Sequence, residues 1–459
     1  MQFGHALLLP QMGRRINLCS YIYKSQPDLS PMKHKLSKDN LALIVFFFIF
    51  LAISLLRYSD NVPGVISSDT EGYYMYLPAV FIQKSVHHVA PGDMNYRKNA
   101  KGEVIIKYTC GVAYFYLPFF LGAHIIAHFY HLNASGSPGF SFPYFYGIII
   151  CGVFWAFVGV FLLQRLLLKF FSRRVAWITI LCIVLGTNFF HYATISVSMS
   201  HIYSFTLTAG ILVLTCNYYR NPAKPTAVLM SLLFGLLILI RPTNCVLLVF
   251  VLLFNVASTR DLKQRYLFFK SHLSDLLFAI PFFIIPIIPQ MIYWKTMTGR
   301  WIVYSYEGEN FIFWRSPKIA AVLFDTQNGL FLYSPILLFV FFGLFAGRKD
   351  HRTNFIGVSI VFIGITYIFA SWWAWWFGGA FGHRCYIEYF PVLAFPFAVA
   401  VEKIDALKMS FKMPFIIILV LFIYYSVAMS FLYGTTQIWD GPGWRWNWLN
   451  WAHEVEKIF

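Results

Sequence analysis

Long apolar runs recur along almost the whole chain, and they constrain its fold more than any other feature. Their lengths approach the ~20 residues that cross a bilayer as a helix, so they predict membrane spans. Only 12% of the residues are charged, about half the fraction usual in soluble domains. We therefore expect an all-α, multi-pass transmembrane helical bundle without a sizeable soluble domain. The runs are residues 41–57, 110–130, 143–163, 175–191, 202–217, 226–240, 243–256, 273–292, 329–347, 354–371, 386–401 and 414–433.

Short clusters of Lys and Arg separate the apolar runs and indicate the orientation of the chain. Connectors rich in Lys and Arg stay on the cytoplasmic side of membrane proteins. The net charge of +17 is spread over these connectors instead of forming one basic face, so we expect no nucleic-acid binding. The clusters lie in residues 1–40, 165–174, 220–224, 260–270, 348–352 and 403–412.

The run 110–130 is expected to lie at the membrane interface, as an interfacial or re-entrant helix. If it crossed the membrane while all basic clusters stayed inside, the basic N-terminal tail would lie outside. Pro118 lies in the middle of the run, and His124, His128 and His131 follow one side of it. The other runs then give about eleven spans, with the N-terminus in the cytoplasm and the C-terminus outside.

This topology divides the chain into three parts. Residues 1–40 are expected to form a cytoplasmic tail, in which Met32 is an alternative start of the protein. Residues 41–433 form the transmembrane domain, with residues 58–142 as a long first outer loop. Residues 434–459 form a short Trp-rich tail on the outer face.

Two acids lie close together soon after the first apolar run, in the segment Ser67-Ser68-Asp69-Thr70-Glu71-Gly72-Tyr73-Tyr74. Carboxylates at a membrane surface are costly to keep unless they are used, which makes Asp69 and Glu71 candidate catalytic residues. A structural interpretation is also open, because acids are favoured in the first turn of a helix. Tyr73 and Tyr74 follow directly and are candidate substrate-binding residues.

The predicted topology gathers further polar residues on the same outer face. An anionic group there would be bound by basic side chains, for which the candidates are Lys107, Arg241, Arg300 and Arg384. Arg384 has an alternative partner in Glu388, one helical turn later. Arg241, next to a proline, is equally consistent with a snorkelling turn residue. For Lys107, in a loop rich in other lysines, a solvated charge is the favoured interpretation.

Two more residues of the outer face are candidate substrate contacts. His201 is either such a contact or a satisfied histidine at the interface. Trp376 belongs to a tryptophan-rich segment typical of interfacial belts, and a sugar would also stack on its ring. His124, His128 and His131 have metal-ligand spacing but no acid in the same helix. We therefore favour no metal and no other cofactor, with a divalent cation as the open alternative.

The layout resembles the GT-C superfamily of membrane glycosyltransferases, such as protein O-mannosyltransferases and lipid A aminoarabinose transferases, which use polyprenyl-phosphate sugars. The resemblance covers residues 41 to about 400 and rests on the acidic outer loop, the interfacial helix and three short segments. It implies a GT-C-like fold with Asp69 as the catalytic base and Glu71, beyond Thr70, as the second choice. The segments are Lys107-Tyr108-Thr109-Cys110-Gly111, Asn328-Gly329-Leu330-Phe331 with Tyr333-Ser334-Pro335, and Trp376-Phe377-Gly378-Gly379 with Phe381-Gly382-His383-Arg384.

The expected activity is therefore transfer of a sugar from a polyprenyl phosphate to a hydroxyl of a lipid, glycan or protein. Such a transfer needs a base for the acceptor proton and cations for the departing phosphate, and a single displacement inverts the anomeric centre. We expect a bacterial inner membrane, with the site on the periplasmic side. A lipid or solute transporter or flippase is the second interpretation, and a non-catalytic assembly factor is the third. A transporter would carry paired charges deep within its spans.

Overall fold

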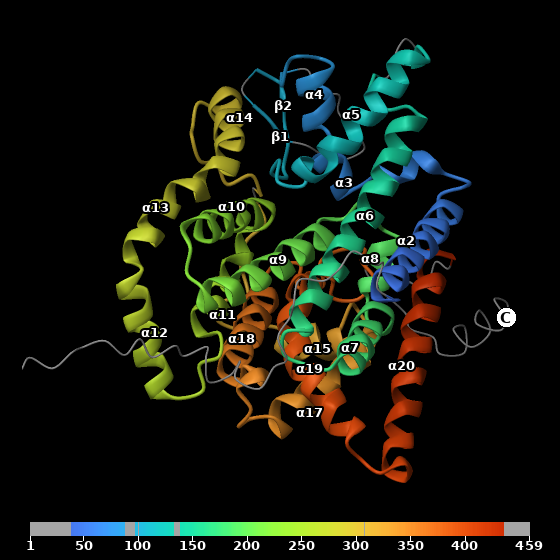
Figure 1. Cartoon of the computed structure of the whole chain (residues 1–459). Helices are drawn as coiled ribbons and strands as arrows, with labels where there is room; N and C mark the ends of the chain where they lie inside the picture. Colours follow the sequence, from blue (N-terminus) through green and yellow to red (C-terminus); the bar gives the residue numbers. More distant parts are fainter. Residues whose placement is uncertain (1–37, 88–96, 100, 133–137, 307, 436–459) are drawn as a thin grey trace, which may run out of the picture.

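The computed structural model describes residues 38–87, 97–99, 101–132, 138–306 and 308–435 of the 459-residue chain. The predicted cytoplasmic tail and the Trp-rich tail lie almost wholly outside this part, as does Met32. Within it the chain is mostly helical (Figure 1). The strands are β1 (Arg97–Lys98) and β2 (Val104–Ile105), an antiparallel pair in which Arg97 lies opposite Ile105.

The helices are given in chain order with their bounds, and η denotes a short 3-10 helix. The first half of the chain contains α2 (Lys38–Arg57), η1 (Val62–Val65), α3 (Asp69–Tyr74), α4 (Tyr76–Phe81), α5 (Ala113–Phe129), α6 (Phe142–Leu167), α7 (Arg173–Gly186), α8 (Phe189–Thr194), α9 (Ser200–Arg220) and α10 (Lys224–Ile240). The second half contains η3 (Pro242–Val246), α11 (Leu247–Leu253), α12 (Thr259–Ser271), α13 (Leu273–Ile284), η4 (Ile285–Ile287), α14 (Ile288–Thr298), α15 (Ile319–Phe324), α16 (Leu330–Tyr333), η5 (Pro335–Leu337), α17 (Leu338–Ala346), η6 (His351–Thr353), α18 (Phe355–Ser371), η7 (Arg384–Tyr389), α19 (Phe390–Asp405) and α20 (Met409–Thr435).

Six helical stretches of the described chain are long and apolar enough to cross a membrane. Each exceeds or nearly reaches the ~20 residues that a bilayer requires. This agrees with the predicted class, an all-α protein with several membrane-spanning helices. The six stretches are Asp39–Arg57, Phe142–Leu167, Leu273–Thr298, His351–Ser371, Arg384–Asp405 and Met409–Tyr433.

Other predicted apolar runs form helices that are shorter or broken. Run 175–191 divides into α7 and α8, and run 329–347 divides into α16, η5 and α17. The second break falls at Ser334 and Pro335, because proline has no backbone N–H for a continuous helix. Helix α10 has 17 residues, about 25 Å at 1.5 Å per residue.

Helix α5, which covers the run predicted to be interfacial, packs along α6 (Figure 1). The two approach closely because Gly147 of α6 faces the backbone carbonyl of Phe119 in α5. Pro118 lies inside α5, as expected. Ile125, Ile126 and Phe129 near its end are exposed apolar side chains. The interfacial position itself stays a prediction.

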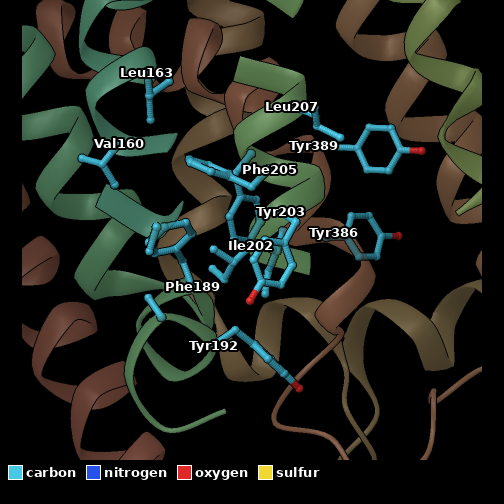
Figure 2. Packing of buried hydrophobic residues seen from close by; sticks show 14 of the residues in the cluster. Val160, Leu163, Phe189, Tyr192, Ile202, Tyr203, Phe205, Leu207, Tyr386 and Tyr389 are labelled. Atoms are coloured by element: carbon cyan, nitrogen blue, oxygen red, sulfur yellow. The ribbon is translucent and has the colours of Figure 1, made fainter. Parts of the chain in front are cut away.

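The core of the protein surrounds α9 and α19, whose side chains are mostly buried. Figure 2 shows Tyr203 and Phe205 of α9 between Val160 of α6 and Tyr386 of η7, all fully or almost fully buried. The shared core fixes α9 against η7, which comes directly before α19. Two elements that carry candidate site residues are therefore held together.

The short elements that follow α2 gather at one end of the molecule, together with β1, β2 and α14 (Figure 1). Hydrogen bonds connect them: Asn99 Nδ2 donates to the carbonyl of Met297 at 3.1 Å, and the backbone N–H of Ile106 donates to Tyr293 Oη at 2.8 Å. Tyr76 Oη of α4 donates to the carbonyl of Tyr108 at 2.6 Å. The loop that carries Lys107 and Tyr108 is thus anchored next to α3 and α4.

Candidate functional site

The first predicted catalytic residue, Asp69, is the first residue of α3, and Glu71 lies in the same first turn. Ser68 directly before it has φ +52°, a left-handed conformation that non-glycine residues seldom adopt. Such strain, about 1–3 kcal/mol, persists only where the surroundings enforce it and is concentrated at functional sites. Thr70 fixes the other side of the turn, since its Oγ1 lies 2.8 Å from Ser198 Oγ.

The carboxylate of Asp69 is held by a cation and a phenol. Oδ2 lies 2.9 Å from Arg384 Nη2, and Tyr108 Oη donates to Oδ1 at 2.5 Å. The side chains of Asp69 and Arg384 are 18% and 12% exposed, so the pair is largely but not fully withdrawn from solvent. Capping of a helix alone would require neither partner.

Electrostatics keep Asp69 ionised and Tyr108 protonated. Burial by itself would raise the pKa of Asp69, but Arg384, the Tyr108 hydroxyl, Arg241 and Lys107 together lower it below the usual value. Burial, and then the negative charge of Asp69, raise the pKa of Tyr108 far above its usual value. At neutral pH the tyrosine is therefore a donor to a carboxylate anion.

The partner of Arg384 is Asp69 and not Glu388, the residue one turn later that the sequence offered as an alternative. Glu388 is buried and pairs instead with Arg241, whose Nε lies 3.2 Å from Oε1. His201 Nδ1 lies 3.0 Å from the same oxygen. Arg241 is accordingly fixed from η7, and is not a free snorkelling side chain.

Lys107 belongs to the same neighbourhood. Its ammonium group forms an ion pair with Glu309 and lies 4.9 Å from the centre of the Tyr306 ring. Tyr306 in turn packs edge-on against Tyr108, with 5.9 Å between ring centres. Lys107 is only partly exposed, so the structure does not favour the interpretation as a freely solvated charge.

The other candidate residues divide into those near Asp69 and those away from it. Tyr73 packs on the Tyr108 ring at 4.9 Å and donates to Ser200 Oγ at 3.4 Å. Tyr74 is fully buried and donates to the carbonyl of Gly139 at 2.5 Å, so it anchors α3 to the segment before α6. Glu71 is partly exposed on the same short helix.

His201, Trp376 and Arg300 lie in different surroundings. His201 is buried beside Glu388, which makes it a partner of the carboxylate and not a surface contact. Trp376 is partly exposed, and its backbone carbonyl accepts a hydrogen bond of 2.6 Å from Asn328 Nδ2. Arg300 is exposed after α14, and the contact found for it in the described chain is from its backbone N–H to Thr298 Oγ1 at 3.3 Å.

The three sequence segments that suggested a family resemblance are connected in space. Asn328 Nδ2 also donates to the carbonyl of Gly378 at 3.1 Å, which ties the Asn328 segment to the Trp376 segment. Asn328 and Phe377 both have positive φ, of +67° and +57°. Gly382 has φ +64°, and a Cβ there would lie 2.8 Å from Tyr333 Cβ. The turns at Phe377 and Gly382 come shortly before Arg384 and bring its side chain to Asp69.

The Lys107 segment approaches Asp69 equally closely. A Cβ on Gly72 would lie 2.4 Å from Cδ2 of Tyr108, so only glycine leaves room for that ring. A Cβ on Gly111 would lie 2.8 Å from the backbone nitrogen of Ile240, next to Arg241. Thr109 Oγ1 donates to the carbonyl of Leu239. Both segments thus position polar side chains through small residues.

No group of three or more His, Cys, Asp and Glu side chains in the described part of the chain is arranged to hold a metal ion. His124 Nδ1 lies 2.7 Å from Tyr144 Oη, which gives that histidine a structural partner.

Cys385 contributes a contact to the site, because its Sγ accepts from Arg241 Nη1 at 2.8 Å.

No model of a known protein family matches the sequence, and no curated protein matches it significantly. The function of the site has to be inferred from its residues and their contacts.

Sequence reasoning did not select Tyr108, Glu388 or Glu309 as site residues. Tyr108 lies within the Lys107 segment, but the sequence pattern indicates a site role only for its neighbour Lys107. Spacing along the helix suggests Glu388 only as a partner of Arg384. Its signal is that it is an acid at the start of a strongly apolar run, which is costly without a partner.

Proposed function

We propose that the chain is a GT-C-like membrane glycosyltransferase that moves a sugar from a polyprenyl phosphate to an acceptor hydroxyl. The observation that carries the proposal is the ionised Asp69 carboxylate held 2.9 Å from Arg384, with Arg241 and Lys107 close enough to lower its pKa. A base and several cations in one partly exposed place are the groups that such a transfer requires. The proposed enzyme has about eleven spans, with its site on the periplasmic side of a bacterial inner membrane.

In the proposed reaction Asp69 accepts the proton of the acceptor hydroxyl as its oxygen attacks the anomeric carbon. The bond between that carbon and the phosphate oxygen breaks, and its electron pair leaves with the polyprenyl phosphate. Arg384 and Arg241 stabilise the charge that the phosphate gains. The displacement inverts the anomeric centre, and no general acid or cofactor takes part.

The ion pair between Asp69 and Arg384 then has a consequence for the order of events. A guanidinium that binds phosphate gives up part of its interaction with the carboxylate, because both anions need the same N–H groups. Binding of the donor would therefore release Asp69 from Arg384 and increase its basicity. Tyr108 continues to orient the carboxylate through its own hydrogen bond.

Lipid or solute transport is the second candidate, and one observation favours it. Glu388, His201 and Arg241 form a buried polar group between η7, α9 and the end of α10. Buried ionisable residues on apolar helices are typical of substrate and proton pathways. Transport would depend on this buried group more than on Asp69, whereas glycosyl transfer depends on both.

Mass spectrometry of surface glycans and lipids tests the proposal in cells with the gene, without it, and with Asp69→Asn. We expect one glycan or lipid species to lose a sugar both in the deletion and in the Asp69→Asn strain, at normal protein level. Unchanged glycans and lipids in the deletion strain would reject glycosyl transfer. If the strain with Asp69→Asn still made the glycan or lipid species that the deletion strain lacks, Asp69 would be rejected as the base.

A further inference from the structure

Glu388 is a buried acid that the proposed reaction does not use directly. Its side chain is 1% exposed, as is that of His201. One oxygen, Oε1, receives both contacts described above, from His201 Nδ1 at 3.0 Å and from Arg241 Nε at 3.2 Å. The other oxygen, Oε2, is buried and has no hydrogen-bond partner within the described chain. The carboxylate is therefore held through Oε1, and losing either partner there would leave it still less compensated, which is strongly unfavourable for a buried charge.

Arg241 is the member of this group that reaches the site. It follows α10 in an extended conformation, with φ −152° and ψ 112°. Its Nε faces Glu388 and its Nη1 donates to Cys385 Sγ, so η7 holds one edge of the guanidinium. Within the described chain no hydrogen-bond partner is found for Nη2. Because the Arg241 side chain is 19% exposed, we assign that end of the planar group to a ligand.

The same short helix carries both arginine contacts. Arg384 begins η7 and pairs with Asp69, while Glu388, four residues later, pairs with Arg241. Residues Cys385 to Tyr389 are buried, which makes η7 a rigid support. The position of one guanidinium relative to the other is thus set by a single element. Two rigidly spaced guanidinium groups match the several oxygens of a phosphate better than one.

We propose that Glu388, supported by His201, is a positioning residue that orients Arg241 toward the phosphate of a polyprenyl-phosphate donor. The inference rests on the proposed function and adds a residue that acts through another one. Glu388 does not touch the donor or the acceptor. It limits the rotation of Arg241 and thereby reduces the entropy that is lost when the phosphate binds.

Binding of undecaprenyl phosphate to the purified full-length protein in nanodiscs tests this role. Glu388→Gln keeps the size of the side chain but loses its charge, and we expect about tenfold weaker binding, the effect of one charge-assisted hydrogen bond. Arg241→Lys should weaken binding to a similar extent. Because Glu388 acts through Arg241, the double variant should bind no more weakly than Arg241→Lys alone.

Glu402→Gln is the matched control. Glu402 lies in the adjoining helix α19 and also pairs with an arginine, Arg352, at 2.6 Å. Its loss should lower the melting temperature without changing the affinity for undecaprenyl phosphate. If Glu388→Gln does not fold, His201→Gln replaces it, and it should also weaken binding because Glu388 loses a fixed partner.

The outcomes separate this inference from the proposed function. Wild-type protein that fails to bind undecaprenyl phosphate would reject the proposed function itself. Wild-type binding with an unchanged affinity in folded Glu388→Gln, or in His201→Gln where that variant is used, would reject only the positioning role. Additive losses in the double variant would also reject it, because they would mean that Glu388 acts independently of Arg241.

Discussion

At the scale of single residues, Asp69 and an incoming phosphate compete for Arg384. Asp69→Asn removes the negative charge 2.9 Å from the guanidinium and leaves the shape of the side chain unchanged. We therefore expect it to bind undecaprenyl phosphate more tightly, by roughly tenfold, since a like charge near the phosphate is lost. Sugar transfer should fall about 10²–10⁴-fold, the usual contribution of a general base.

Binding of undecaprenyl phosphate and turnover are measured on the same preparation of Asp69→Asn, to check that binding tightens while turnover falls. Tyr108→Phe is the control, because it removes the hydrogen bond to Asp69 but keeps the carboxylate and its charge. It should reduce turnover without tightening the binding of undecaprenyl phosphate. Weaker binding by Asp69→Asn would contradict the competition for Arg384 and favour a purely structural ion pair.

At the scale of elements, the contact between α3 and the Lys107 segment depends on Gly72. An alanine there would place its Cβ 2.4 Å from the Tyr108 ring, which has to move and would lose its hydrogen bond to Asp69. We expect Gly72→Ala to destabilise the protein by about 1–3 kcal/mol, as overpacking does, and to lower turnover at least as much as Tyr108→Phe.

Melting temperature and turnover of Gly72→Ala, compared with Gly122→Ala, measure this effect. Gly122 lies in α5, and apart from the backbone of its own helix and its chain neighbours no atom of the described residues lies within 4 Å of its Cβ position. Alanine is the better helix former, so Gly122→Ala should leave stability equal or slightly higher. If Gly72→Ala melted and turned over like the wild type, Tyr108 would not need its present position.

The same elements show what the sequence could and could not predict. Each predicted apolar run in the described chain contains helix, because apolar length alone dictates it. The breaks within runs 175–191 and 329–347 were not predicted, although Pro335 was visible. The partner of Arg384 could not be deduced either. Local spacing offered Glu388, whereas Asp69 becomes available only through turns at Phe377 and Gly382 with positive φ.

For the molecule as a whole, the residues that charge distribution assigns to one side of the membrane include those that the fold brings close together. The orientation assigned from basic clusters placed Asp69, Lys107, Arg241 and Arg384 in one compartment, and the structure brings these four side chains into one neighbourhood. Arg300 belongs to the same predicted compartment, and its side chain is exposed after α14. Charge bias predicts only on which side of the membrane a connector lies. Which side chains touch one another depends on how η7, α9 and α3 pack.

Cysteine labelling in intact cells tests both the orientation and the interfacial position of α5. Lys101→Cys, Leu132→Cys and Lys349→Cys place thiols at exposed positions, in a background in which Cys19 and Cys245 are serine. A membrane-impermeant maleimide should label the first two from outside, and Lys349→Cys only after permeabilisation. The reason is that positions 101 and 132 flank α5, so they lie on one side only if α5 does not cross the membrane. Protection of Leu132→Cys alone would show that α5 is a full span. If instead Lys349→Cys were labelled from outside and the other two only after permeabilisation, the predicted orientation would be reversed and Asp69 would lie on the cytoplasmic face.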